Sequence, residues 1–389
     1  MSQSNVSLAS IPQAAPEAYK QLDQARHGGA PIYTLSLASL AQMPPLPAVN
    51  WTSIGKEAPQ ISDPSGYDKT KPLPKADVVI LTWTDAEWAA LDHVFCDSDV
   101  AMSYNAIADT KSWNGSWLFY ARDFSSVAGE LTGKSPSKAN QAWGRFRIVT
   151  INAKKVLLFK SDMHISTDSV KIPLINLVSQ IIADAKPSLI LTIGTAGGTR
   201  NQDDLGTVSI TNAAHFLLDG EYKTKTFNNK TYSSSWKTTA AKLAVVDKLL
   251  METPVVTAHL QELLAKMNTK EKSNLTLAQV ENKEIKPGAI PPKLNILATP
   301  VLTTNGYGVG NTGGNYKDYA AVEMDDAVVA MQASVAGTVF GVLRNISDPV
   351  QNAALAEKIQ QSWAGSIYNA YGFYSSFNGA LAAWASLED

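Results

Sequence analysis

Cysteine is almost absent from this chain, because Cys96 is the only one among 389 residues. A single thiol excludes an internal disulfide framework and a cysteine-based metal site. We expect Cys96 to be a small buried residue rather than a nucleophile. Metal-ligand spacing is also absent among the histidines His27, His93, His215 and His259. The sequence therefore predicts no metal site, and we expect that no organic cofactor is needed.

Long apolar runs and concentrated positive charge are absent as well. No apolar run approaches the roughly 20 residues that span a bilayer, and residues 1–6 lack the basic and apolar regions of a secretory signal. The chain carries 33 Lys and Arg against 35 Asp and Glu, a formal net charge of -2. It has no basic cluster of the kind that nucleic-acid phosphates require. We expect no membrane or nucleic-acid partner and a cytoplasmic location.

Several catalytic signatures are also missing. No Gly-x-Gly-x-x-Gly motif or Walker loop is present, which makes a dinucleotide or ATP site a weak interpretation. No Gly-x-Ser-x-Gly elbow appears, although its absence does not exclude a Ser-His-Asp triad. What the chain does have is 45% hydrophobic and 17% charged residues, the composition of a globular enzyme. Its length allows one large core or two modest ones.

The chain changes character after residue 75. Residues 1–75 are rich in proline, serine and alanine and predict an N-terminal extension. From Asp77 a β-branched apolar run leads directly into a helical pattern, which is how an α/β unit begins. We predict one α/β domain over residues 76–389, with insertions near 97–145 and 216–290.

Hydrophobic periodicity predicts the order of the elements. Apolar, β-branched runs predict strands near 77–83, 116–122, 145–151, 155–160, 188–193, 206–210, 294–303 and 338–346. Helical spacing predicts helices near 16–27, 34–42, 84–95, 173–185, 238–251, 257–267, 323–335 and 352–386. We expect the last helix to be broken near Gly365 or Gly372.

A glycine-rich segment follows the predicted strand 188–193 directly. It consists of Gly194, Thr195, Ala196, Gly197 and Gly198. Ligands of open α/β sheets bind beyond the carboxyl ends of strands. Glycines there permit close approach, and bare amides can bind a phosphate, a ribose or an attacking water. A tight structural turn explains the segment equally well.

Acidic side chains end other predicted strands. Glu87 fits a capping box with Thr84, and it is also a candidate general base that takes a proton from water. Asp348 is either a turn residue or the donor of a proton to a leaving base. Glu323 and Asp325 lie where acids stabilise a helix dipole, yet a carboxylate can also clamp ribose hydroxyls.

Two neighbouring residues have weaker claims. Met324, between the two acids, either packs on a sugar face or belongs to the core. His164 follows the strand 155–160 and lies either in a pocket or at the surface. Neither residue alone indicates a chemistry.

The order of these segments resembles the nucleoside phosphorylase and nucleosidase superfamily. The similarity rests on Gly-Thr-Ala-Gly-Gly at 194–198, Val-Glu-Met-Asp at 322–325 and Arg-Asn-Ile-Ser-Asp at 344–348. It is strongest to the branch of methylthioadenosine/S-adenosylhomocysteine nucleosidases. The resemblance implies a three-layer αβα fold with a mixed central sheet. It also implies a small-molecule purine nucleoside or nucleotide as partner and a homo-oligomer, a dimer or larger.

The resemblance also implies a role for each motif residue. Glu87 would activate water, and Asp348 would protonate the purine, which Ser347 also contacts. Met324 and Asp325 would hold the ribose. The glycine-rich wall near the nucleophile would consist of Thr195, Ala196, Gly197 and Gly198.

Two positions depart from the family pattern. The ribose-binding residue after Met324 is usually glutamate, whereas this chain has the shorter Asp325. The purine-stacking aromatic has no clear counterpart, and Tyr307 is the candidate substitute. Phosphorylases of the superfamily hold phosphate with arginines, one shortly after the first strand. Here Glu87 follows that strand and favours hydrolysis, while Arg200 keeps phosphorolysis open. A nucleoside-binding sensor without turnover is the third hypothesis.

Overall fold

The fold is described from a computed structural model. It describes residues 32–104, 114–131, 135–165, 169–200, 203–281, 292–306, 315–348, 352 and 354–388. The helix predicted at 16–27 and the candidate Tyr307 lie outside the described residues. In the described part of the chain, no helix has both the length and the apolarity needed to cross a membrane.

Four parallel strands form the centre of the sheet. β2 (Val78–Thr82) lies between β5 (Lys154–Ser161) and β6 (Leu189–Gly197), and β13 (Val339–Asp348) pairs with the other edge of β6. Every residue of β2 is buried, as expected for a parallel strand covered on both faces. The carboxyl ends of these strands therefore lie at one edge of the sheet.

Antiparallel strands extend this centre and make the sheet mixed. β4 (Gly144–Ile151) pairs antiparallel with β5, and β4 in turn pairs with β3 (Leu118–Tyr120) and β1 (Gln60–Ile61). On the other side, β7 (Val208–Thr211) runs antiparallel to β13 and carries β10 (Leu294–Ile296). The sheet is therefore parallel at its centre, antiparallel beyond β5, and mixed beyond β13.

A second branch leaves β6 at its carboxyl end. The short β12 (Val322–Glu323) pairs with β6 through Val322 and Gly197, and it continues into β11 (Val301–Thr303), β8 (Ala213–Phe216) and β9 (Thr231–Ser233). The strand character predicted over 294–303 is found at both ends of that range. The range contains two strands, β10 and β11, that pair with different neighbours.

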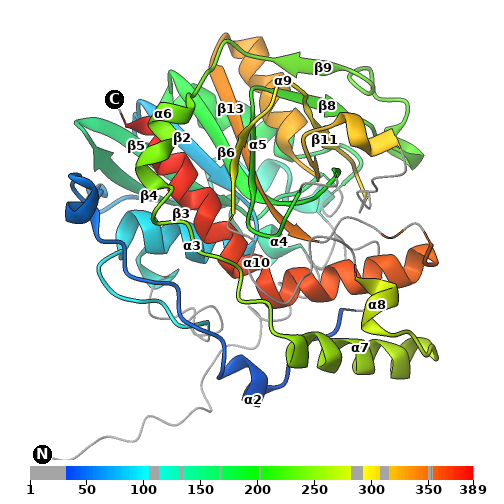
Figure 1. The fold of residues 1–389 in the computed structure, drawn as a ribbon. Coiled ribbons are helices and arrows are strands. Elements are labelled where there is room, and N and C mark those ends of the chain that lie inside the picture. The colour runs from blue at the N-terminus through cyan, green and yellow to red at the C-terminus, as the bar shows by residue number, and fades with distance from the viewer. Residues whose placement is uncertain are drawn as a thin grey trace, which may run out of the picture.

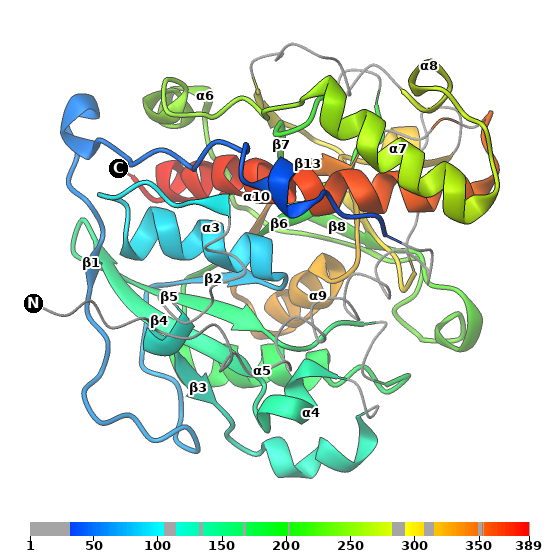
Figure 2. The same cartoon turned by 90° about the horizontal axis from the view of Figure 1, so that it is seen from below.

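Helices cover both faces of the sheet (Figure 1). α3 (Asp85–Cys96) and α10 (Glu357–Leu387) lie side by side on one face, as Figure 2 shows. α5 (Leu174–Ala185) and α9 (Asp326–Ala336) pack together on the other. Each face has its own cluster of buried apolar side chains. The predicted three-layer αβα fold with a mixed central sheet is confirmed.

Shorter helices lie at the periphery. The longest of them, α7 (Thr257–Glu271), contacts α10 and α8 (Leu277–Val280). The others are α2 (Leu37–Leu40), α4 (Pro136–Asn140) and α6 (Ala240–Leu243). Single 3-10 turns occur at Trp51–Ile54, Asn114–Ser116, Phe124–Ser126, Ala128–Glu130, Gly220–Tyr222, Ala244–Val246 and Asn315–Asp318. The helix predicted at 238–251 is therefore much shorter than expected.

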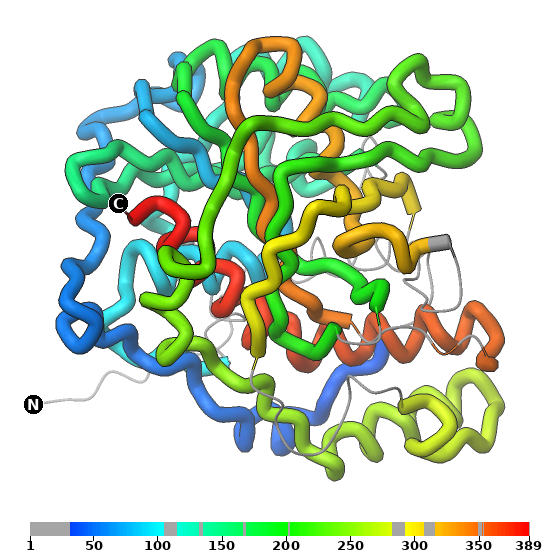
Figure 3. The backbone as a smooth tube through the Cα atoms, turned by 45° about the horizontal axis from the view of Figure 1, so that its top comes forward, coloured from blue at the N-terminus to red at the C-terminus, as the bar shows by residue number. Residues whose placement is uncertain are grey.

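The described part of the N-terminal segment is packed onto the domain. The blue tube of Figure 3 follows residues 32–75 along the outside of the molecule. Leu46 and Trp51 are buried, and Trp51 Nε1 donates to Ser98 Oγ at 2.8 Å. The Trp51 ring also lies 4.3 Å from that of Trp384 in α10, measured between centroids. These residues complete the apolar face around α10.

The last helix is continuous, so the predicted break near Gly365 or Gly372 is wrong. A glycine inside a helix costs only about 1 kcal/mol relative to alanine. Residues Ser362–Leu387 are buried with few exceptions, and burial of so many side chains outweighs that cost. Glycine supplies close approach here, since a Cβ at Gly372 would lie 2.9 Å from the Tyr368 ring.

Candidate active site

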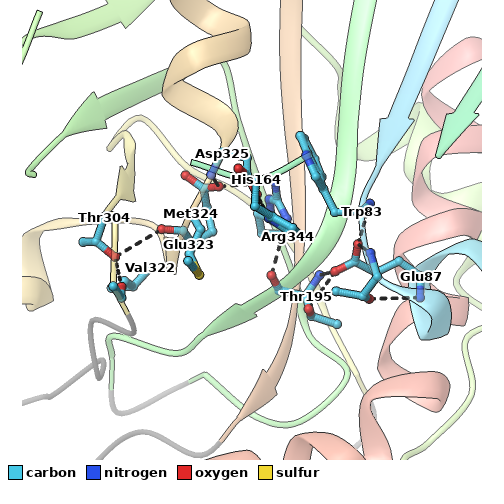
Figure 4. A pocket seen from close by; sticks show the side chains of 12 residues that line it. Trp83, Glu87, His164, Thr195, Thr304, Val322, Glu323, Met324, Asp325 and Arg344 are labelled. Carbon is cyan, nitrogen blue, oxygen red and sulfur yellow. Dashed lines mark hydrogen bonds and ion pairs between the residues drawn. The ribbon is translucent and has the colours of Figure 1, made fainter. Parts of the chain in front are cut away.

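A pocket opens at the carboxyl ends of the central strands, where β2, β6 and β12 meet the start of α9 (Figure 4). Five of its lining side chains are acidic, basic or imidazole groups. The described lining consists of Trp83, Thr84, Glu87, His164, Thr195, Thr304, Gly306, Val322, Glu323, Met324, Asp325 and Arg344. The position agrees with the rule that α/β sheets bind ligands beyond their strand ends.

The glycine-rich segment is part of a strand rather than a turn. β6 continues to Gly197 because β13 pairs with it along its length, as far as Asp348 opposite Gly197. The predicted turn is therefore wrong at Gly194–Gly197, which belong to β6. A Cβ at Gly194 would collide with the Arg344 guanidinium and lie 2.9 Å from Glu87 Oε1. Glycine is required there by close approach of two charged side chains.

Glu87 forms the predicted capping box with Thr84 at the start of α3, and it also lines the pocket. Its Oε2 accepts hydrogen bonds from the amides of Trp83 (3.0 Å) and Thr84 (2.9 Å) and from Thr82 Oγ1 (2.9 Å). Its Oε1 accepts from the amide and hydroxyl of Thr195, each at 2.7 Å. Five donors hold the carboxylate in one orientation and favour its ionised form.

Arg344 lies buried in the middle of the acidic side chains (Figure 4). Its guanidinium pairs with both oxygens of Asp326 at 2.7 and 2.5 Å and reaches Glu323 Oε2 at 3.3 Å. It also lies over the Trp83 ring, 4.9 Å from the centroid. Burial opposes the charge, but the attraction of Asp326 and Glu323 outweighs it and raises the pKa of Arg344.

Glu323 is buried at the end of β12, beside the start of α9. Its Oε1 accepts from the hydroxyl of Thr303, and its Oε2 from the amides of Asp325 (2.5 Å) and Asp326 (2.8 Å). Burial, followed by repulsion from Asp326, raises the pKa of Glu323 to about 8, against the opposing attraction of Arg344. Glu323 therefore keeps its proton to a higher pH than an ordinary glutamate does.

Asp325 and His164 form a buried pair. His164 Nδ1 lies 2.5 Å from Asp325 Oδ2, and the amide of Ile165 donates to Asp325 Oδ1 at 3.0 Å. The His164 ring also lies 6.4 Å from that of Trp83, measured between centroids. His164, a minor candidate in the sequence, is thus a wall of the pocket and the direct partner of the predicted ribose-binding residue.

The other predicted residues lie beside the pocket or away from it. Ala196, Gly197, Gly198, Ser347 and Asp348 are not among the described lining residues. Ser347 and Asp348 are fully buried at the end of β13, where Ser347 Oγ donates to Asp348 Oδ1 at 3.1 Å.

Arg200 is also outside the described lining. It pairs with Asp203 through Nε at 3.0 Å and Nη2 at 2.6 Å, and Nη2 also reaches Ser209 Oγ. Its guanidinium is therefore committed to partners of its own.

Several lining residues carried no role in the sequence interpretation, among them Trp83, Thr304 and Arg344. Trp83 follows β2 and precedes the capping Thr84, and Thr304 follows β11. Arg344 opened the second acidic motif, but a strand interior is an unusual place for a charged side chain. An arginine inside an apolar run, with acids at the start of the preceding helix, was the available signal. Among the described residues, no cluster of three or more His, Cys, Asp or Glu could hold a metal ion.

Comparison with known proteins gives matches in structure alone, since no family model and no curated protein sequence matches this chain. Futalosine hydrolase of Helicobacter pylori strain 26695 is 12% identical, with a TM-score of 0.43 over 80% of this chain and 96% of that chain. A 5′-methylthioadenosine/S-adenosylhomocysteine nucleosidase from Neisseria meningitidis, in complex with methylthio-immucillin-A, is 13% identical, with a TM-score of 0.42 over 80% and 97%.

A putative nucleosidase of the same kind from Borrelia burgdorferi B31, bound to adenine, is 13% identical, with a TM-score of 0.45 over 80% of this chain and 98% of that chain. At these identities the chemistry of this chain has to be inferred from its own residues.

Proposed function

We propose that this protein is a nucleosidase that hydrolyses the N-glycosidic bond of a purine nucleoside or a related ribosyl substrate. The observation that carries the proposal is the charge of the pocket. Three carboxyl groups line it, those of Glu87, Glu323 and Asp325, while Asp326 pairs with Arg344, the one guanidinium of the described lining. Even with one of these carboxyl groups protonated, negative charge exceeds positive charge.

An excess of negative charge suits glycosidic cleavage. The transition state resembles an oxocarbenium ion, with positive charge on the sugar that is absent from the neutral substrate. Fixed carboxylates in a water-poor pocket stabilise that charge more than they stabilise the substrate, which is what accelerates a reaction. The donors around Glu87 hold it in place before the charge develops.

We assign proton donation to the leaving base to Asp348. It lies opposite Gly197 in the pairing of β13 and β6, two residues beyond Thr195 of the pocket. Two residues of a strand span about 7 Å, and we propose that the base extends from a sugar beside Thr195 toward Asp348. A departing purine anion is a poor leaving group, and protonation by a nearby acid removes that barrier.

We assign the attacking water to Glu87. Because its oxygens already accept five hydrogen bonds, it is a weak base before the reaction. A weak base suffices for a strongly electrophilic sugar cation, since the water needs to lose its proton only late. Glu87 therefore orients the water first and takes its proton afterwards.

Phosphorolysis, the runner-up, is disfavoured by the same charges. A phosphate dianion would add negative charge to an acidic pocket. Arg344 is paired with Asp326, and Arg200 is paired with Asp203 outside the described lining. Neither guanidinium is positioned to bind phosphate without giving up a buried carboxylate.

The test is release of free base from adenosine, inosine, methylthioadenosine, S-adenosylhomocysteine and AMP, with and without phosphate. We expect release of base and free sugar in phosphate-free buffer. Asp348→Asn should lower kcat by at least about 100-fold, the usual contribution of a general acid. The matched control is Asp318→Asn, at an exposed position away from the pocket.

Each alternative gives a different result. Strict dependence on phosphate, with a sugar phosphate as product, would replace the hydrolase by a phosphorylase. Nucleoside binding without cleavage, unchanged in Asp348→Asn, would indicate the binding sensor.

A further inference from the structure

Arg344 lies on the pocket wall close to Glu87. Its Nη1 reaches the carbonyl oxygen of Thr195 at 3.4 Å, and a Cβ at Gly194 would collide with this nitrogen and lie 2.9 Å from Glu87 Oε1. The guanidinium and the proposed base therefore flank one backbone position of β6. Arginine is the side chain best suited to bind oxyanions such as phosphate. An anion held by Arg344 would thus lie beside Glu87, in the place of the attacking water.

The nitrogens of Arg344 that could hold such an anion are already used within the protein. An arginine binds a carboxylate or a phosphate with two parallel N–H groups. Here Nε donates to Asp326 Oδ2 at 2.7 Å and Nη2 donates to Asp326 Oδ1 at 2.5 Å. Nη2 also reaches Glu323 Oε2 at 3.3 Å. With Nη1 directed at Thr195, each nitrogen of the guanidinium has an oxygen of the protein as its partner.

The face of the guanidinium is covered as well. Arg344 lies over the Trp83 ring, 4.9 Å from its centroid, and the Arg344 side chain is only 4% exposed. Asp326 is fully buried and is not among the described lining residues, so it holds Arg344 from outside that lining. An anion in the pocket could make a bidentate contact only by displacing Asp326. That displacement is strongly unfavourable, because it leaves a buried carboxylate without its partner.

Glu323 is a second counter-ion for the same guanidinium. Burial, followed by repulsion from Asp326, raises the pKa of Glu323, and the attraction of Arg344 opposes both. Loss of the Asp326 charge would remove the repulsion, so Glu323 would ionise more readily and pair with Arg344 through the contact already present. Removal of one acid therefore leaves the other to neutralise Arg344.

We propose that Asp326 and Glu323 are the residues that determine the nucleophile of this enzyme. They hold Arg344 as an internal counter-ion, so the pocket admits water beside Glu87 and excludes phosphate and other tetrahedral oxyanions. The proposal rests on the proposed function, and it explains why a pocket that contains an arginine uses water. Without both acids, the guanidinium would bind an oxyanion from the pocket with two N–H groups.

The experiment titrates sulfate and phosphate into wild type and three variants and measures Kd by calorimetry. Sulfate is the main probe, because it remains a dianion from pH 5.5 to pH 8.5. Wild type should show no saturable binding, and Asp326→Asn and Glu323→Gln alone should bind weakly. The double variant should bind both anions roughly 10- to 100-fold more tightly than either single variant, the range for a hydrogen bond to a charged group.

Two controls assign the bound anion to Arg344. Addition of Arg344→Gln to the double variant should abolish the gain in affinity. Asp203→Asn is the matched control, since Asp203 is equally buried and pairs with Nε and Nη2 of Arg200 outside the described pocket lining. It should leave the affinity for sulfate at the wild-type level.

Circular dichroism identifies a variant that unfolds. If the double variant is unfolded, Asp326→Asn replaces it, with sulfate titrated at pH 5.5 and 8.5. Glu323 keeps more of its proton at the lower pH, so the affinity of Asp326→Asn should rise from pH 8.5 to 5.5 by more than that of Asp203→Asn. An equal rise in the two variants would overturn the proposal.

The outcomes separate this proposal from the proposed function, because anion binding needs no turnover. Sulfate binding by wild type as tight as that of the double variant, no gain in a folded double variant, or a gain that persists without Arg344 overturns the role of the two acids. The nucleosidase then still stands on base release in phosphate-free buffer. A gain in the double variant without base release by wild type overturns the nucleosidase and supports Asp326 and Glu323 as residues that exclude anions.

Discussion

At the scale of single residues, the site depends on how closely charged side chains approach β6. Arg344 and Glu87 both reach the backbone at Gly194, where any side chain would displace them. Arg344 separates Glu87 from Asp326 and Glu323, and its attraction for these acids raises its pKa. The geometry of the whole acidic cluster thus depends on a residue without a side chain.

Gly194→Ala should therefore damage both stability and activity. The added methyl group would push the guanidinium away from Asp326 or Glu87 away from Thr195, and overpacking of this kind costs about 1–3 kcal/mol. Chemical denaturation and base release are the measurements. The control is Gly129→Ala, where a Cβ meets no atom within 4 Å. Equal behaviour of the two variants would show that the acidic cluster tolerates the displacement.

The sequence predicted which acidic residues lie in the pocket, but it did not predict which side chains they contact. Glu87, Glu323 and Asp325 were expected near a strand end because short acidic motifs follow apolar runs, and all three line the pocket. Arg344 and Trp83 were missed because their roles come from contacts across the fold, with Asp326 and with each other. A periodic pattern reports burial, but it does not report which buried charges face one another.

At the scale of elements, β13 connects the acidic cluster with the predicted proton donor. The strand carries Arg344 near its middle and Asp348 at its end, and it pairs with β6 on one edge and β7 on the other. Near the start of this strand, Gly341 packs directly against the Trp236 ring. Small changes at this position should therefore reach the site through the strand.

Gly341→Ala is the test of that coupling. The new Cβ would lie 2.5 Å from Cδ2 of the Trp236 ring, closer than real contacts allow. Because an indole cannot fold away as a flexible chain can, we expect a loss of about 1–3 kcal/mol in the free energy of unfolding. Gly115→Ala, which has open space around it, is the control. Unchanged stability of Gly341→Ala would mean that the Trp236 segment moves freely.

The predicted boundaries of strands and helices were wrong where contacts with other elements determine where the element ends. β6 runs through Gly197 because β13 and β12 pair with it there, although glycine-rich residues favour a turn locally. α10 continues past Gly365 and Gly372 because its buried surface outweighs two weak helix formers. Strands and helices with strong periodicity, such as β2 and α5, were predicted to within a few residues.

At the scale of the whole molecule, the fold buries four acidic side chains around one arginine, Arg344. The four acids around Arg344 are contributed by α3, β12 and the start of α9, which meet only in the folded chain. Folding brings these acids together and removes them from water. Their desolvation and mutual repulsion therefore lower the stability of the folded state. Glu323 has its pKa raised to about 8 by burial and by Asp326.

This raised pKa predicts the pH dependence of stability. An unfolded glutamate titrates near 4.5, so between about pH 4.5 and 8 the folded state holds a proton that the unfolded state has lost. Stability from this group is complete below pH 4.5 and is lost as the pH rises through about 8. Asp92, whose pKa burial raises to about 6, acts in the same direction at lower pH.

Urea denaturation of wild type and Glu323→Gln at pH 5.5, 7 and 8.5 isolates the Glu323 contribution. Glutamine keeps an oxygen for the amides of Asp325 and Asp326 but cannot ionise, while Asp92 titrates in both proteins. The unfolding midpoint of the variant should therefore fall less between pH 5.5 and 8.5 than that of wild type. Parallel decreases in both proteins would mean that Glu323 is already ionised at pH 5.5, with Arg344 as its counter-ion.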